Sequence, residues 1–146
     1  MKNILVPIDF SSVGRKVIET AGSVARSMGA KLWLVHVAAP DPDFVGFKTG
    51  PTYVREHLAT VLRQEHAQLQ AMAEDLRAAG LDVEALLVQG PTTETLLDEA
   101  ERVKAELIIM GSHGRSGLFK AFIGSVCEQV LSASRIPVLI VPSPDR

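Results

Sequence analysis

The chain has 146 residues, of which 47% are hydrophobic, a size and composition that suit one domain with a single core. Its 15 basic and 17 acidic residues are interspersed and give a formal charge of −2, so no positive field would attract nucleic acid or an anionic membrane. Cys127 is the single cysteine and cannot form an internal disulfide. The apolar run from Ile4 to Ile8 is too short for a signal peptide, and no run approaches the roughly 20 residues that span a bilayer. We expect a soluble, cytoplasmic protein.

The first elements alternate between a short apolar run and an amphipathic stretch. Residues 3–8 are almost continuously apolar, which predicts a strand covered on both faces. Pro7 lacks an N–H group, so we place it near the carboxyl end of this strand. Ser11 and Ser12 are typical helix N-cap residues, and the apolar residues after them recur at helical spacing until Gly29. The start of the chain therefore predicts a strand followed by a helix.

The pattern repeats in the middle of the chain. Residues 31–37 predict a second buried strand, and the prolines and glycines of 40–51 indicate an irregular connection at the ligand-binding end of the sheet. From about Tyr53 to Ala79 a helical apolar stripe opposes charged residues. Residues 81–88 begin with strict apolar–polar alternation, which predicts a strand with one wetter face at a sheet edge.

The last part of the chain contains two more units of this kind. Thr92 or Thr93 can cap a short helix, which precedes a predicted strand over 106–110. A helix from about Ser125 to Ser134 and a strand over 137–141 follow a glycine-rich segment. Five strands alternating with four helices predict an α/β fold, a doubly wound open parallel sheet with helices on both faces. Periodicity does not determine the strand order.

The glycine-rich segment lies between a predicted strand and a predicted helix. Ligands of open parallel sheets bind beyond the carboxyl ends of the strands, where glycines allow close backbone approach and a helix start directs N–H groups at anions. The segment therefore predicts a phosphate-binding site. It is neither a Walker A loop nor a dinucleotide fingerprint, because both motifs are absent from the chain.

The spacing of the glycines is Gly111, two residues, Gly114, nine residues, then Gly124 and Ser125. It resembles the nucleotide-binding pattern G-2x-G-9x-G-[S/T] of the universal stress protein family. The segments Ile4 to Asp9 and Pro137 to Pro142 also look like that family, so the resemblance covers essentially the whole chain.

The resemblance implies a Rossmann-like sheet with the order 3-2-1-4-5 and a regulatory or sensor role in the stress response. It also implies that the chain binds ATP, together with Mg²⁺. The nucleotide-binding residues that it implies, with His113 facing the nucleotide, are Pro7, Asp9, Val37, Gly111, His113, Gly114, Arg115, Gly124, Ser125 and Val126.

Three of these residues have a second interpretation. Ser125 and Glu128 match the capping-box pattern S-x-x-E, which accounts for the serine but not for Gly124, so we favour phosphate binding. Asp9 is either a turn or N-cap residue or, as the resemblance implies, a carboxylate that binds the ribose hydroxyls or a phosphate-bound metal. Val37 is in isolation a core valine, and the resemblance implies backbone contact with adenine.

The remaining polar residues suggest no further chemistry. Arg115 and Lys120 are cations that could neutralise phosphate charge or simply lie in an exposed loop. For Cys127, a helix start favours a reactive thiol, but we expect burial against the sheet and assign it no role. The four histidines, His36, His57, His66 and His113, show no metal-ligand spacing, so we expect no metal site built from protein ligands alone.

Three functions remain open on these grounds. The leading one is an ATP-binding regulatory module, and the second is a slow Mg²⁺-dependent ATPase that uses Asp9, although no general base can be named. The third is a nucleotide-free dimerisation module whose glycines serve packing. The last strand is apolar on both faces, yet the implied order places it at a sheet edge. We therefore expect a homodimer formed through Val138, Leu139, Ile140 and Val141.

Overall fold

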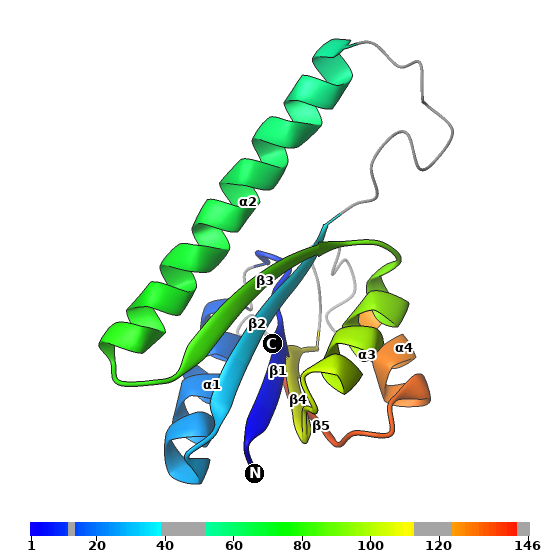
Figure 1. Cartoon of the computed structure of the whole chain (residues 1–146). Coiled ribbons are helices and arrows are strands. Elements are labelled where there is room, and N and C mark those ends of the chain that lie inside the picture. Colours follow the sequence, from blue (N-terminus) through cyan, green and yellow to red (C-terminus); the bar gives the residue numbers. More distant parts are fainter. Residues whose placement is uncertain (12–13, 39–51, 113–123, 143–146) are drawn as a thin grey trace.

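The computed structural model describes residues 1–11, 14–38, 52–112 and 124–142. Within these ranges the chain forms a five-stranded parallel sheet in the order β3-β2-β1-β4-β5, as predicted (Figure 1). The strands are β1 (Asn3–Pro7), β2 (Lys31–Ala38), β3 (Val83–Gln89), β4 (Leu107–Gly111) and β5 (Val138–Val141).

Four helices cover the two faces of this sheet. The buried side chains of α1 and α2 form one core with the sheet, and those of α3 and α4 form the other. Because consecutive strands are joined by these helices and run parallel, the fold is the predicted doubly wound α/β architecture. The helices are α1 (Gly14–Met28), α2 (Thr52–Ala78), α3 (Thr92–Arg102) and α4 (Ser125–Ala133).

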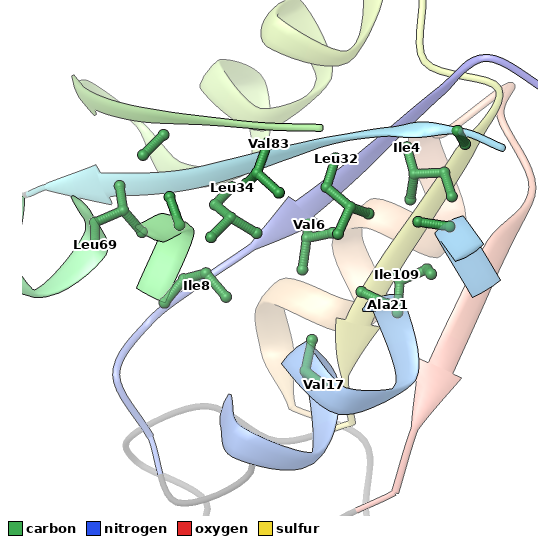
Figure 2. Packing of buried hydrophobic residues seen from close by; sticks show 14 of the residues in the cluster. Ile4, Val6, Ile8, Val17, Ala21, Leu32, Leu34, Leu69, Val83 and Ile109 are labelled. Carbon is green, nitrogen blue, oxygen red and sulfur yellow. The ribbon is translucent and has the colours of Figure 1, made fainter. Parts of the chain in front are cut away.

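The two cores explain why apolar residues follow one another directly in β1. Ile4 and Val6 of β1 belong to the core beneath α1 and α2, which also contains Val17 of α1 (Figure 2). Leu5, between them in sequence, belongs to the core beneath α3 and α4. All three strand residues have no exposed surface. Successive side chains of a strand point to opposite faces, so a strand covered on both faces needs no polar position.

The ladder between β1 and β4 is shorter than its neighbours. β1 pairs with β2 at five positions, from Asn3 to Pro7, but its pairing with β4 consists of Ile4 with Leu107 and Leu5 with Ile108. The order in which strands are added also reverses at β1. β2 and β3 lie on one side of β1, whereas β4 and β5 lie on the other side. The carboxyl halves of β1 and β4 therefore form the switch point, the usual ligand-binding position in open α/β sheets.

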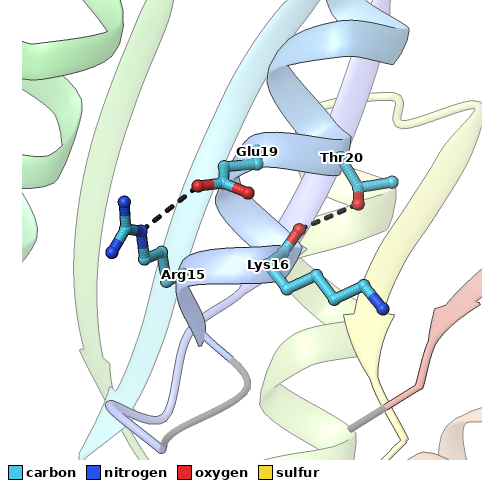
Figure 3. A network of polar contacts seen from close by, with 4 residues as sticks. All are labelled: Arg15, Lys16, Glu19 and Thr20. Carbon is cyan, nitrogen blue, oxygen red and sulfur yellow. Dashed lines mark hydrogen bonds and ion pairs between the residues drawn. The ribbon is translucent and has the colours of Figure 1, made fainter. Parts of the chain in front are cut away.

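The outer surfaces of the helices carry the expected exposed polar groups. On α1 the Arg15 Nε atom lies 3.2 Å from the Glu19 Oε1 atom, and the Thr20 hydroxyl donates to the Lys16 carbonyl (Figure 3). Both members of the ion pair are largely exposed, so it contributes only a few tenths of a kcal/mol, about 0.3–0.5. No helix in the described ranges is long and apolar enough to cross a membrane.

The predicted N-cap of α3 is wrong, and the predicted N-cap of α1 is tested only at Ser11. The N-cap of α3 is Pro91, without a side-chain cap, and Thr93 inside the helix donates instead to Gln129 of α4 at 2.6 Å. Before α1, Ser11 supplies its backbone carbonyl to the Gly14 N–H, while its hydroxyl has no partner in the described part of the chain; Ser12 lies outside that part. The predicted stop at Gly29 is confirmed, since this residue has a φ of 63° directly after α1.

Candidate functional site

The carboxyl ends of the central strands bring most of the predicted site residues to one edge of the sheet. Pro7 ends β1, Val37 is the last but one residue of β2, and Gly111 ends β4. Parallel strands present their carboxyl ends at the same edge, so these three positions share it. The predicted residues His113, Gly114 and Arg115, and also Lys120, lie outside the described residues.

Ser112 ties the two ends of the glycine segment together. Its N–H donates to the Val141 carbonyl at 2.8 Å, and its carbonyl accepts the Gly124 N–H at 2.6 Å. The side chain is buried, with 4% exposed. These two bonds hold the start of α4 against the ends of β4 and β5. The role of Ser112 was not predicted, because no local pattern distinguishes it from other serines of a glycine-rich turn.

The start of α4 differs from the predicted capping box. Gly124 is the N-cap, Ser125 is the first helical residue and exposed, and no side chain among the described residues caps the helix. The Glu128 N–H donates to the Gly124 carbonyl at 3.0 Å. The capping-box interpretation is therefore wrong, since it requires Ser125 at the N-cap. Without a capping side chain, the first N–H groups of α4 remain available to an anion, which the helix dipole also favours.

Gly124 has backbone angles that any residue can adopt, a φ of −63° and a ψ of 156°. The backbone conformation therefore does not require a glycine here. A glycine would be required if another group approached the backbone closely. Val126 is half-buried and packs against the core beneath α3 and α4, so its backbone N–H, rather than its side chain, faces the helix start. The arrangement suits recognition of a phosphate by main-chain atoms.

Asp9 lies just beyond β1, on the same edge. It is half-buried, and its Oδ1 atom accepts the Ser11 N–H at 3.0 Å, which is the turn role foreseen as the alternative. The next residue, Phe10, has a φ of 60°, an uncommon conformation for a residue with a side chain. Such strain concentrates at functional sites, and here it directs the chain away from β1 immediately after the carboxylate.

Val37 lies on β2, opposite Val88 of β3, and packs into the core beneath α3 and α4. Its side chain thus has the structural role of a core valine. The backbone at this position is part of the carboxyl edge, two strands from Gly111.

A buried polar pair that was not predicted lies beside this edge. His36 of β2 contacts the Ile8 carbonyl through Nδ1 at 2.6 Å and the Glu65 carboxylate of α2 through Nε2. A signal was present in the sequence. His36 interrupts an apolar strand, and Glu65 falls four residues before Leu69, on the apolar stripe of its helix.

Two further observations limit the chemistry of the site. Within the described ranges no three His, Cys, Asp or Glu side chains gather in a way that could hold a metal ion. Cys127 is buried as expected, with 2% exposed, and this burial raises the pKa of its thiol. Among the described residues, this edge presents the N–H groups at the start of α4 and the carboxylate of Asp9.

The strand order and the uncapped helix start define a doubly wound α/β protein with its candidate site at the switch point. The chain belongs to the universal stress protein family, whose model matches residues 1–142. Among curated proteins it is 33% identical over 141 residues to a universal stress protein of Thermus aquaticus, covering 96% of this chain and 98% of the relative. It is 32% identical over 143 residues to universal stress protein YxiE of Bacillus subtilis, covering 94% and 97%.

Solved structures agree with this assignment. The structure of protein MJ0577 of Methanocaldococcus jannaschii has a TM-score of 0.81 and 27% identity, with 97% of this chain and 95% of that one covered. A universal stress protein in complex with cAMP has a TM-score of 0.70 and 26% identity, with 97% of both chains covered. An adenine nucleotide thus binds to a protein of the same family and fold.

Proposed function

We propose that this protein binds ATP at the switch point and acts as a regulatory or sensor module in a stress response. The phosphates lie against Gly111, Gly124, Ser125 and the Val126 N–H, and the ribose hydroxyls bind to Asp9. Adenine contacts the backbone at Val37, beside Pro7. The residues His113, Gly114 and Arg115, which belong to the same motif, complete the proposed site. Mg²⁺ enters with the nucleotide, bound mainly by its phosphates.

The start of α4 is the observation that carries this proposal. Gly124 occupies an N-cap position that requires no glycine, and in the described part of the chain no side chain caps the helix there. Serine, threonine, aspartate or asparagine there would add a capping side chain, although glycine at an N-cap costs only a few tenths of a kcal/mol, about 0.3, relative to them. A ligand phosphate at the same point accounts for both features. The cAMP complex of a relative with 26% identity supports an adenine nucleotide as the ligand.

Calorimetric titration of the purified protein with ATP and Mg²⁺ tests the proposal. We expect saturable binding, and we expect Gly124→Val to abolish it without unfolding the protein, because the valine side chain fills the space that the phosphate needs. Gly14→Ala is the control, since a Cβ atom at Gly14 would meet no atom within 4 Å. No heat and no thermal shift at millimolar ATP, or normal binding by Gly124→Val, would refute the proposed site.

Turnover of bound ATP separates the regulatory role from a slow ATPase. We expect hydrolysis to be slow or absent, because one oxygen of Asp9 already accepts the Ser11 N–H and no nucleophile and base pair is present among the described residues. Single-turnover measurements with radiolabelled ATP give the rate of hydrolysis directly. Several turnovers per second, lost in Asp9→Asn, would establish the enzyme instead.

The proposed assembly is a homodimer through β5. Among the described strands β5 pairs only with β4, and its apolar residues Val138, Leu139 and Ile140 stay partly exposed. An apolar edge strand of this kind invites pairing with another strand, and antiparallel pairing with its own copy would bury both edges at once.

A further inference from the structure

The turn that follows β1 has an uncommon backbone conformation. Phe10 has a φ of 60°, in the left-handed region that a bulky side chain seldom enters. Lys104 is the other non-glycine residue in the described ranges with a positive φ, and it directly follows the C-cap of α3, where helices commonly end in this conformation. Phe10 follows a strand instead, so the end of a helix does not account for its conformation.

Contacts with β2 hold the residues on both sides of Asp9. The Ile8 N–H donates to the Val35 carbonyl at 2.8 Å, and the Ile8 carbonyl oxygen lies 2.6 Å from Nδ1 of His36. The ring of Phe10 packs against the same imidazole, with the ring centroids 4.7 Å apart and the planes tilted by 51°. One side chain of β2 therefore contacts both the residue before Asp9 and the residue after it.

The imidazole of His36 is itself held in place, so it is a fixed support for this turn. It is 6% exposed, and its Nε2 atom contacts the Glu65 carboxylate of α2 while Nδ1 contacts Ile8. Ile8, labelled in Figure 2, belongs to the core beneath α1 and α2, and Phe10 also packs against that core. Apolar burial and the ring contact thus offset the cost of the positive φ at Phe10.

The carboxylate of Asp9 lies within this turn. Its Oδ1 atom accepts the Ser11 N–H at 3.0 Å, and Asp9 and Phe10 are both half-buried. We propose that Phe10 is a positioning residue, whose ring holds the turn in the conformation in which the Asp9 carboxylate binds the ribose hydroxyls of the nucleotide. This inference rests on the proposed function, in which Asp9 has that role. Phe10 acts through Asp9 rather than by contact with the nucleotide.

The preference for a ribose that carries hydroxyl groups tests the proposal. Calorimetric titration compares ATP with 2′,3′-dideoxy-ATP, which has the same base and triphosphate but lacks both hydroxyls. We expect the wild type to bind ATP at least about tenfold more tightly, as befits a hydrogen bond to a charged group. Phe10→Ala should bring the two affinities to near equality, as should Asp9→Ala, and combining the two substitutions should cause no further loss.

Two more substitutions at this position separate the ring from the backbone. Phe10→Gly removes the ring but adopts a positive φ without steric cost, so we expect it to lose most of the preference as well. Phe10→Tyr retains the ring and should retain the preference. Wild-type preference in Phe10→Ala or Phe10→Gly would overturn the proposal. So would equal affinities in the wild type, because Asp9 would then not bind the ribose.

Val24→Ala is the matched control for a general loss of packing. Val24 packs against the same core as Phe10, but from the second half of α1. We expect this variant to be less stable than the wild type and to keep the full preference for ATP. An equal loss of preference in Val24→Ala would show that general destabilisation is the cause and would overturn the positioning role.

Hydrogen exchange in the nucleotide-free protein tests the positioning role without relying on the proposed function. The Ser11 N–H reports on the turn through its bond to Asp9, and the Ile8 N–H reports on the adjacent strand end. We expect Phe10→Ala to speed exchange at Ser11 by about three- to tenfold, because the ring contact no longer opposes local opening, with little change at Ile8.

Equal exchange at Ser11 in the wild type and Phe10→Ala would overturn the positioning role. If Phe10→Ala does not fold, Phe10→Leu replaces it, since leucine keeps most of the apolar volume but not the ring, and exchange at Ser11 should still be faster than in the wild type. Failure of the wild type to bind ATP would refute the proposed function, whereas exchange at Ser11 would still decide whether Phe10 holds the turn.

Discussion

The reactivity of Cys127 follows from its burial in α4 beneath the sheet. Removal from water disfavours the thiolate, so the pKa of this thiol is raised above its ordinary value of 9.0. We expect the native protein to react slowly with a thiol reagent and the guanidinium-unfolded protein to react at once. The thiol group's contribution to stability is complete below the ordinary pKa and is lost as the pH rises through the raised one. Rapid native labelling at neutral pH would contradict the burial.

Gly90, between β3 and α3, is a position where a side chain cannot be added without strain. Its φ is 150°, and a Cβ atom would lie 2.6 Å from the Thr95 Oγ1 atom. We expect Gly90→Ala to lower the free energy of unfolding by about 1–3 kcal/mol in urea titration. Combining it with Thr95→Ala removes the clash but not the backbone strain, so recovery should be partial. Thr95→Ala alone is the control, and an unchanged midpoint in Gly90→Ala would contradict the prediction.

Among the elements, α2 is held against the sheet by buried side chains that include Leu69. Leu69 has no exposed surface and joins the core with Leu34. Leu69→Ala should cost about 2–5 kcal/mol, from lost burial and the cavity left behind. Leu131→Ala on α4, at a side chain 43% exposed, should change stability by no more than about 0.5 kcal/mol. Urea unfolding measures both, and equal effects would show that Leu69 is not the anchor.

Hydrophobic patterns were sufficient to predict the elements, whereas their ends depended on contacts made in three dimensions. The apolar run of β1 can only be a strand covered on both faces, and its core partners bear this out. The capping prediction for α3 failed because Thr93 has a partner on α4, which no local pattern reveals. β5 begins at Val138 rather than Pro137, since proline donates no ladder hydrogen bond, although its carbonyl accepts from Ile108.

The candidate site was predictable only where it is encoded locally. The sequence predicted that a helix starts at Ser125, directly after Gly124, because a helix start is a local feature, while the role of both residues in binding stays a prediction. The bonds of Ser112 to Val141 and Gly124 join three separate segments and could not be foreseen. The pairing of His36 with Glu65 also depends on the placement of α2 over β2, although each residue is conspicuous in its own element.

The whole molecule is expected to be a dimer in solution. Light scattering at micromolar concentration should give about twice the 15.7 kDa chain mass. Leu139→Lys or Ile140→Lys should halve it, because a charge on β5 opposes strand pairing. Leu131→Lys, an exposed position on α4, is the control and should leave the mass unchanged. A monomeric wild-type protein would contradict the β5 interface.

The central position of β1 has a consequence for a chain that emerges from the ribosome N-terminus first. β1, β2 and β3 can assemble in the order in which they are made, but the other edge of β1 must wait for β4, which begins only at Leu107. Until then Ile4, Leu5 and Val6, which the finished protein buries, belong to an open strand edge. The nascent protein is thus most vulnerable to aggregation between the completion of β3 and the arrival of β4, the interval in which a chaperone would protect it.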